Sequence, residues 1–351
     1  MHQTTFTLTL ITLFVTGCGP GLAGLPDHEL EHSETRGVQE RFSTARTAGP
    51  SSGFPGRRVR DAVPGSSRTS TLLTVDPIDE DFVEDVIADE IFGSHIAVSN
   101  LEYTGSLDAI ATFEYTGDDL GLDGGIVLST GNALSASGPN QQSQVTTQFF
   151  TAGDDDLEAS IDYVTFDAAS IEFDFETSSS DLFALEFVLG SEEYPEFIGS
   201  MFSDSFGIFI SEIDTDLDPD IGEVPQNIAR MENIFDMDCA LVGDEIKLWA
   251  VTPFTNPCLY VDNSGQTNND DLVDVYANLD GDDIEYDGFS RPLRLTIPVQ
   301  PHAKYHIKIV IADTSDAKFD SGLFIQRGSF LGSKPLPVRP LVDAPFGSKL
   351  K

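Results

Sequence analysis

The feature that most constrains this chain is a long stretch with negative charge and no positive charge. Between Thr71 and Ala229 there are 35 aspartates and glutamates but no lysine or arginine. Salt bridges within the stretch cannot neutralise it, and self-repulsion of that size disfavours a compact fold unless cations or salt screen it. A domain built here therefore needs bound divalent cations, high ambient salt, or both. Nucleic acid is not expected as a partner, because phosphate binding needs the missing Lys and Arg side chains.

The charge balance changes near Ser70. From Thr71 to Gly332 there are 52 acidic residues against eight basic ones, whereas residues 19–70 hold seven arginines and six acids. Residues 19–70 are also rich in Gly, Pro and Ser and show no apolar period, which is typical of a disordered tether. We therefore predict one β domain over residues 71–332, preceded by the tether and followed by a Pro-rich tail over residues 333–351.

Residues 1–18 indicate export. The apolar run from Thr5 to Val15 is too short to span a bilayer, and it leads into Val15-Thr16-Gly17-Cys18, which resembles the lipobox of bacterial lipoproteins. The resemblance implies a signal peptide over residues 1–18, a lipid on Cys18, and outer-membrane sorting because Gly19 follows. No Lys or Arg precedes the apolar run, so a plain secretory signal with a chance cysteine stays open.

The two other cysteines, Cys239 and Cys258, form an even pair in an exported chain. Cysteines outside the cytoplasm are usually oxidised, so we expect a disulfide between them. Two free buried thiols are the alternative.

Strict alternation of apolar and polar residues predicts antiparallel sheets, each with one face in a core. The predicted fold is mainly β, an antiparallel sandwich or jelly roll with one N-terminal helix. We expect that helix to be capped by Asp76, to have Pro77 at its first position and to end at Gly93. Its apolar stripe would be Ile78, Phe82, Val86 and Ile87. The alternating apolar positions are Ile171, Phe173, Phe175; Phe183, Leu185, Phe187, Leu189; Phe206, Ile208, Ile210; Leu293, Leu295, Ile297, Val299; and Tyr305, Ile307, Ile309, Ile311.

Several ordered motifs lie between roughly Val75 and Phe330. The most specific block is Gly190-Ser191-Glu192-Glu193-Tyr194-Pro195-Glu196-Phe197-Ile198-Gly199-Ser200, followed by Phe202-Ser203-Asp204-Ser205-Phe206-Gly207. Together these motifs resemble the choice-of-anchor L domain family of bacterial surface proteins. The resemblance implies an extracellular β-rich module held at the cell by an anchor, with no settled catalytic activity or ligand. Further matching segments are Gly125–Gly131, Gly138–Asn140, Thr151–Leu157, Glu285–Phe289 and Ile311–Asp313.

Five acids in these motifs are candidate metal ligands: Asp154, Asp156, Glu192, Glu193 and Asp204. Loops at one end of a sandwich could bring their carboxylates together, and hard oxygen ligands in flexible numbers suit Ca²⁺. The alternative to a metal site is that these acids lie in solvated loops, where they cap the chain and bind no metal. Nucleophilic catalysis finds little support, because the sequence has no Gly-x-Ser-x-Gly motif and no free cysteine paired with a histidine.

We therefore predict a non-catalytic binding or adhesion module, lipid-anchored at the outer membrane or cell surface and stabilised by Ca²⁺. Its partner would be a surface polymer or a protein. One alternative is a secreted hydrolase of a surface polysaccharide, with Glu192 or Glu193 as the general acid at a raised pKa. The other is a structural surface protein whose acidity is an adaptation to brine.

Overall fold

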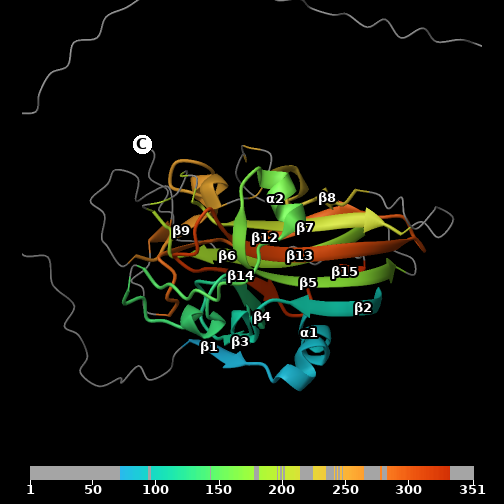
Figure 1. Cartoon of the computed structure of the whole chain (residues 1–351), viewed down its shortest axis with the longest axis horizontal. Helices are drawn as coiled ribbons and strands as arrows, with labels where there is room; N and C mark the ends of the chain where they lie inside the picture. The colour runs from blue at the N-terminus through green and yellow to red at the C-terminus, as the bar shows by residue number, and fades with distance from the viewer. Residues whose placement is uncertain are drawn as a thin grey trace, which may run out of the picture. The chain divides into compact units, whose positions relative to one another are not determined.

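The computed structural model describes a single β domain between residues 72 and 332. It consists of two sheets, in which every strand pair except β9–β10 is antiparallel. This confirms the predicted mainly β, antiparallel sandwich fold (Figure 1). The described ranges are 72–93, 96–142, 144–177, 182–195, 202–213, 224–234, 248–264, 277–278 and 283–332, with positions 197, 200, 241, 243 and 246.

The larger sheet has ten strands and is organised around β6. Its order is β1-β3-β4-β14-β6-β11-β9-β10, and β12 and β15 also pair with β6. Strand β6 thus joins four neighbours, because its length allows different partners along each edge. The strands are β1 Leu73–Pro77, β3 Ile110–Tyr115, β4 Gly124–Ser129, β6 Leu182–Ser191, β9 Tyr260–Asp262, β10 Ala277–Asn278, β11 Gly288–Ser290, β12 Leu293–Pro298, β14 Ser321–Gln326 and β15 Leu331–Gly332.

The smaller sheet has five strands in the order β2-β5-β13-β7-β8. Its central strand β13 pairs along most of its length with β5 on one side and β7 on the other. The register of β5 and β13 aligns acidic with basic residues on the outer face, for example Asp174 opposite His306 and Glu172 opposite Lys308. The strands are β2 Ile96–Thr104, β5 Thr165–Thr177, β7 Ser205–Glu212, β8 Gln226–Asn227 and β13 Lys304–Thr314.

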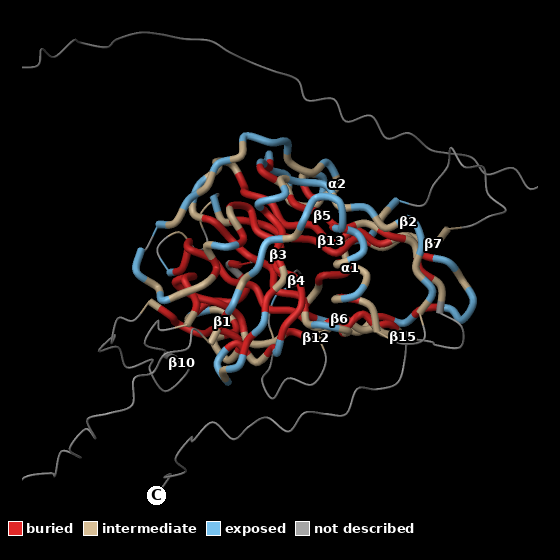
Figure 2. Tube along the Cα trace, turned by 90° about the horizontal axis from the view of Figure 1, so that it is seen from below, coloured by how far each residue is buried: buried red, intermediate tan, exposed pale blue. Residues whose placement is uncertain are grey.

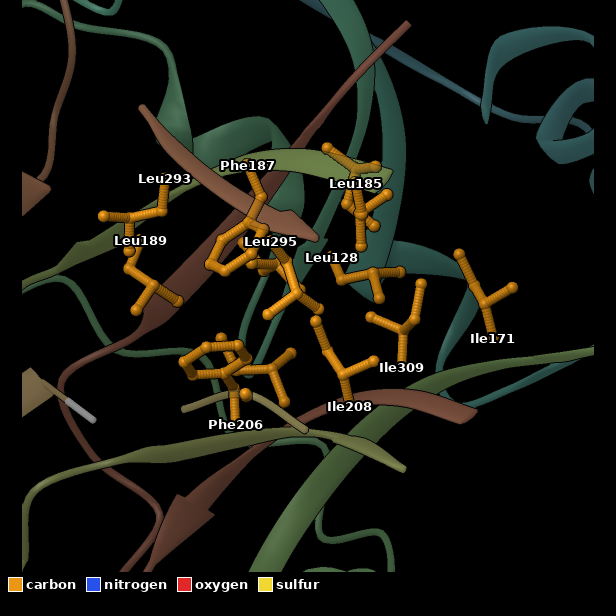
Figure 3. Packing of buried hydrophobic residues seen from close by; sticks show 14 of the residues in the cluster. Leu128, Ile171, Leu185, Phe187, Leu189, Phe206, Ile208, Leu293, Leu295 and Ile309 are labelled. Carbon is orange, nitrogen blue, oxygen red and sulfur yellow. The ribbon is translucent and has the colours of Figure 1, made fainter. Parts of the chain in front are cut away.

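The main core lies between the two sheets. Figure 3 shows side chains of β6 and β12, including Phe187 and Leu295, facing Ile208 of β7 and Ile309 of β13. The alternating residues predicted from the sequence line this interface, because successive strand side chains point to opposite faces. The buried segments form the interior of the domain, and the exposed ones lie at its outside (Figure 2).

An aromatic group closes the core beside helix α1 (Val83–Ile91). Phe330 lies at its centre. The centroid of its ring is 5.2 Å from that of the tilted ring of Phe183, and it meets Phe173 and Phe175 edge to face, with ring centroids 4.9 and 5.2 Å away. Phe92, at the end of α1, lies 5.8 Å from the same ring. Edge-to-face packing of this kind adds stabilisation beyond the burial of area.

The first helix differs from the prediction. Asp76 and Pro77 belong to the edge strand β1, and the α-helix begins only at Val83, after a 3-10 turn that Asp79 caps through Asp81 N. Pro77 is tolerated in β1 because an edge strand does not need every N–H. The buried stripe is Val83, Ile87 and Ile91, whereas Phe82, predicted to be buried, is 54% exposed.

A second short helix, α2 (Asp155–Ile161), was not predicted. It packs on the outer face of the smaller sheet, where Leu157 contacts the buried Phe209, Val310 and Ala312. Residues 1–71 and 333–351 lie outside the described residues, so the predicted signal peptide, tether and tail stay predictions. Cys239 is also outside them. Cys258 lies in a 3-10 turn against the core, and its predicted disulfide with Cys239 stays a prediction.

Candidate functional site

Four strands of the two sheets bring five acidic residues to one end of the domain. Strands β6 and β14 are aligned there by the pair Ser191–Ser321, and β7 and β13 by the pair Ser205–Ala312. Acids lie at or directly beyond these strand ends. We call the five residues the acidic cluster: Glu192, Glu193, Asp204, Asp313 and Asp320.

Asp204 connects the two sheets within the acidic cluster. Its backbone N–H donates to Glu193 Oε2 at 2.9 Å. Its carboxylate accepts from Thr314 N at 3.1 Å and from Ser321 Oγ at 2.6 Å, so it bonds to a strand of each sheet. The position of Asp204 is therefore fixed by β13 and β14 together, although it lies more than a hundred residues from both in the sequence.

The segment before Phe149 covers Glu192 and Asp320. Val145 N donates to Glu192 Oε2 at 3.4 Å, and Thr147 N donates to Asp320 Oδ1 at 2.7 Å. The backbone of Asp320 also accepts from Glu192 N at 3.1 Å. These bonds hold the two carboxylates beneath the segment, away from water.

Among the residues that the structure describes, four carboxylate oxygens of the acidic cluster have no hydrogen-bond partner: Glu192 Oε1, Glu193 Oε1, Asp313 Oδ1 and Asp320 Oδ2. Their residues are at most 2% exposed. Buried polar atoms are nearly always paired, and an exception calls for an explanation such as a bound ion. A charged carboxylate is especially costly to bury unpaired. Protons or cations must therefore neutralise this end of the domain.

The cost of burying these charges raises the pKa values of all five acids of the cluster. Burial is the largest cause in each case, and it raises the pKa of Glu192 to about 9, of Glu193 to about 8, of Asp313 to about 11 and of Asp320 to about 6. Burial and then the charge of Glu193 raise the pKa of Asp204 well above its usual range. Without a cation, most of these groups hold protons at neutral pH.

A second acidic pair lies beside Glu192. Asp287 Oδ1 accepts from Asn140 Nδ2 at 2.7 Å, and the two oxygens of Glu285 accept from Gln141 N and Gln142 N at 3.3 and 3.2 Å. The charges of Asp287 and Glu285 both contribute to the raised pKa of Glu192. Two segments matched to the family in the sequence, 138–140 and 285–289, thus meet next to the acidic cluster.

The structure separates the five predicted ligands into two groups. Glu192, Glu193 and Asp204 belong to the acidic cluster. Asp154 and Asp156 instead lie at the start of α2, where Lys308 Nζ donates to Asp154 Oδ2 at 2.8 Å and also to Asp156. Asp154 caps the helix as well, through Leu157 N at 2.9 Å. A lysine and a helix terminus satisfy these two acids, so they do not need a metal ion.

Sequence reasoning missed Asp313 and Asp320. Asp313 carried a signal, because it continues the row of Ile307, Ile309 and Ile311 on the core face of β13. An acid on the apolar face of a strand is unusual unless it is neutralised. Asp320 precedes β14 with no comparable pattern.

The acidic cluster is not a ready-formed metal cage. Among the residues that the structure describes, no three or more His, Cys, Asp or Glu side chains have the spacing needed to hold a metal ion. The unpaired oxygens are nevertheless of the hard type that Ca²⁺ prefers, and its coordination geometry is flexible. Rotation of side chains toward a cation, with hydroxyl or backbone oxygens added, could complete a site here.

Fold and site together define a β-sandwich domain with a buried, carboxylate-rich end. Residues 74–331 match the choice-of-anchor L domain, and the chain belongs to that family. It is therefore a protein associated with the cell surface. No curated protein and no solved structure matches the chain. Within the described ranges, no helix is both long enough and apolar enough to cross a bilayer.

Proposed function

We propose that the protein is a lipid-anchored binding or adhesion module of the cell envelope, that Ca²⁺ stabilises its β domain, and that it has no catalytic activity. Family membership supports the cell-surface location. The anchor rests on the lipobox-like sequence ending at Cys18. The partner would be a surface polymer or another protein.

One observation supports the calcium proposal: four buried carboxylate oxygens, with no hydrogen-bond partner among the described residues, lie at the end where the two sheets are joined. A cation bound there would replace the protons that otherwise neutralise the acidic cluster. It would also link β6 and β14 of one sheet to β7 and β13 of the other. Extracellular modules typically bind Ca²⁺ with dissociation constants of about 10⁻⁴–10⁻³ M.

Thermal unfolding of the full-length protein tests this proposal. A ligand that binds only the folded state at a hundred times its Kd stabilises it by about 2.7 kcal/mol. For a domain of this size, that corresponds to a rise in Tm of roughly 5 °C or more. The scans compare CaCl₂ with EGTA at pH 7 and fixed ionic strength. An unchanged Tm would contradict the calcium proposal.

Two controls separate calcium from its alternatives. KCl without Ca²⁺ tests the brine adaptation, which predicts that stability rises with salt and ignores calcium. Asp204→Asn should weaken the calcium response, whereas Asp154→Asn should keep it in full, because Asp154 binds Lys308 outside the acidic cluster. A calcium response that is unchanged in Asp204→Asn would contradict a role for Asp204 in binding the ion.

The hydrolase alternative receives little support from the described residues. The raised pKa of Glu192 suits a general acid. However, Glu192 is only 1% exposed and Glu193 is fully buried, so a polysaccharide would have no access to either carboxyl. Hydrolysis of a glycan panel by the wild type, lost in Glu192→Gln or Glu193→Gln, would overturn the non-catalytic proposal.

The lipid anchor has its own test. Wild-type protein should partition with membranes and carry acyl chains on its N-terminal residue, as mass spectrometry of the mature N-terminal peptide would show. Cys18→Ser should remain soluble or unprocessed. A wild-type chain cleaved elsewhere and free of lipid would favour the plain secretory signal.

A further inference from the structure

Exposed apolar side chains gather on one segment of the domain. Among the residues that the structure describes, ten large apolar side chains are exposed, and four of them lie between residues 150 and 166. They are Tyr163, Val164, Phe166 and, most exposed of the four at 83%, Phe150. This segment passes through α2, on the outer face of the smaller sheet (Figure 1). We call these four side chains the apolar surface.

The two phenylalanines of the apolar surface lie on neighbouring lengths of backbone. Phe166, in β5, forms an isolated antiparallel bridge with Ala152, two residues after Phe150. Ala168 N donates to Ala152 O at 3.1 Å, so the chain after Phe150 runs beside the start of β5. Aromatic side chains at such diagonal positions on neighbouring strands are within reach of each other. Contiguous exposed apolar groups of this kind are typical of interaction sites.

The backbone holds Phe150 outward. Its φ is 58°, a left-handed conformation that is unusual for a bulky side chain. The residues on both sides of it are fixed, because the buried carboxylate of Asp167 accepts from Phe149 N at 3.0 Å and from Thr151 N at 2.6 Å. Asp167 also has a positive φ, of 48°. Backbone conformations of this kind persist only where their surroundings impose them, and they are concentrated at functional sites.

The apolar surface lies among negative charges. Residues 146–168 hold six acids and no lysine or arginine. Two of these acids, Asp155 and Asp162, are exposed at the two ends of α2. Lys308 is already engaged by two others, and exposed Lys318 adds one positive charge on the segment after β13. Such a surface repels anionic polymers and attracts cationic ones.

We propose that the apolar surface binds a basic segment of another protein. Apolar side chains of the partner would pack on Phe150 and Phe166, and its Lys or Arg side chains would pair with the surrounding acids. Cations also bind favourably over the faces of aromatic rings. A second copy of this β domain does not fit, because it carries the same excess of acids. The inference rests on the proposed binding function, and it adds the chemistry of the partner and the surface that the partner contacts.

Binding of a defined peptide tests the inference. Full-length protein in CaCl₂ at physiological ionic strength is titrated into a dye-labelled peptide of alternating arginine and valine, and fluorescence anisotropy gives the Kd. The wild type should bind this peptide and should not bind a peptide of glutamate and valine. A peptide of arginine and serine should bind at least about tenfold more weakly, because it has no apolar side chains to bury. Equal binding of the arginine–serine peptide would show that charge alone attracts it, and would overturn the proposal.

Matched variants then assign the contact surface. Phe150→Ser should weaken binding of the arginine–valine peptide by about tenfold or more, as the loss of an aromatic anchor does. Phe82→Ser is the control, because Phe82 is also exposed but precedes α1, which lies at the lower side of Figure 1 whereas α2 lies at the upper side. The control should bind as the wild type does, and an equal loss in both variants would overturn the assignment.

Hydrogen exchange in the wild type gives a measurement that needs no variant. The arginine–valine peptide should slow amide exchange in residues 146–152 and 162–168. Protection confined to other segments would place the peptide elsewhere and refute the assignment, even if Phe150→Ser does not fold.

The outcomes distinguish this inference from the proposed function. A wild type that binds none of the peptides, but whose Tm responds to calcium, would overturn the inference and leave the proposed calcium binding and anchor standing. Dextran binding that is lost in Phe150→Ser, with no peptide bound, would make the surface a sugar site and overturn the protein partner. An unchanged Tm in CaCl₂, with the peptide bound as expected, would overturn the calcium proposal alone.

Discussion

Substitution of Glu192 by glutamine should have opposite effects on stability in the absence and the presence of calcium. Glu192 is 1% exposed, and its Oε2 accepts one long hydrogen bond, of 3.4 Å, from Val145 N. Its Oε1 has no hydrogen-bond partner among the described residues. Burial and then the charge of Asp287 raise its pKa from the ordinary 4.5 to about 9. Glutamine keeps the shape of the side chain but cannot ionise.

Proton linkage gives the direction in which Glu192→Gln changes the free energy of unfolding without calcium. Between pH 4.5 and pH 9 the folded chain keeps a proton on Glu192 that the unfolded chain has released. Stability attributable to this group is therefore complete below pH 4.5 and falls by about 1.4 kcal/mol per pH unit as the pH rises. At pH 7 the accumulated loss is roughly 3 kcal/mol. Without calcium, Glu192→Gln avoids this loss and should be more stable than the wild type by up to that amount.

If Ca²⁺ binds at the acidic cluster as proposed, calcium should reverse the comparison, because the ion would use an ionised Glu192 as a ligand. Urea unfolding at pH 5 and pH 7, in EGTA and in CaCl₂, measures all four free energies. In EGTA the advantage of the variant should grow from pH 5 to pH 7. In CaCl₂ the wild type should gain more than the variant and become the more stable protein. Glu102→Gln, on the exposed strand β2, should change stability by less than about 0.5 kcal/mol throughout.

One result would refute the reasoning directly. If Glu192→Gln in EGTA is less stable than the wild type by the same amount at pH 5 and pH 7, its carboxyl does not titrate between them. The raised pKa of Glu192 would then be wrong, and with it the claim that the acidic cluster holds protons in the absence of calcium.

Three other substitutions test separate parts of the structure. Lys308→Met should lower the free energy of unfolding in urea by about 2–3 kcal/mol. This is less than the loss of a fully buried ion pair would cost, because Asp156 is 42% exposed. The calcium response should survive in this variant, and its loss would show that Lys308 contributes to calcium binding. Phe330→Ala should cost about 3–5 kcal/mol and Phe330→Leu less than about 1.5, because leucine fills much of the cavity that alanine leaves. Equal losses would show instead that the ring contacts, and not the filled volume, account for the stabilisation. The hydrogen bond from His306 to Glu172, and then the one to Asp174, raise the pKa of the His306 ring. The charged ring therefore stabilises the fold below pH 6.5, and this stabilisation is lost as the pH rises through the raised pKa. His306→Gln should accordingly lower Tm at pH 5.5 but not at pH 9, and a pH-independent effect would contradict this.

Much of the fold could be predicted from the sequence, because a half-buried strand imposes alternation on its own residues. The rows in β5, β6, β7, β12 and β13 all line the core as expected. The start of the first helix could not be predicted in the same way. Asp76 and Pro77 match a helix start locally, but pairing of β1 with β3, more than thirty residues later, makes them part of a strand.

The acidic cluster could be predicted only in part, because contacts between residues far apart in the sequence complete it. Glu192, Glu193 and Asp204 lie within a short, distinctive block of the sequence. Lys308, by contrast, is 154 residues from Asp154, and no local pattern shows that it neutralises Asp154 and Asp156. Asp320 joins the acidic cluster only through the pairing of β14 with β6.

The position of β1 has a mechanical consequence. It is the terminal strand of the larger sheet, joined to β3 over five residue pairs, and it is the first element of the described domain. Tension transmitted along the chain from the N-terminal side therefore reaches the β1–β3 ladder before any other element. The strands that carry the acidic cluster lie further inside both sheets. Under load, β1 would separate first, and the end of the domain that holds the acidic cluster would keep its shape.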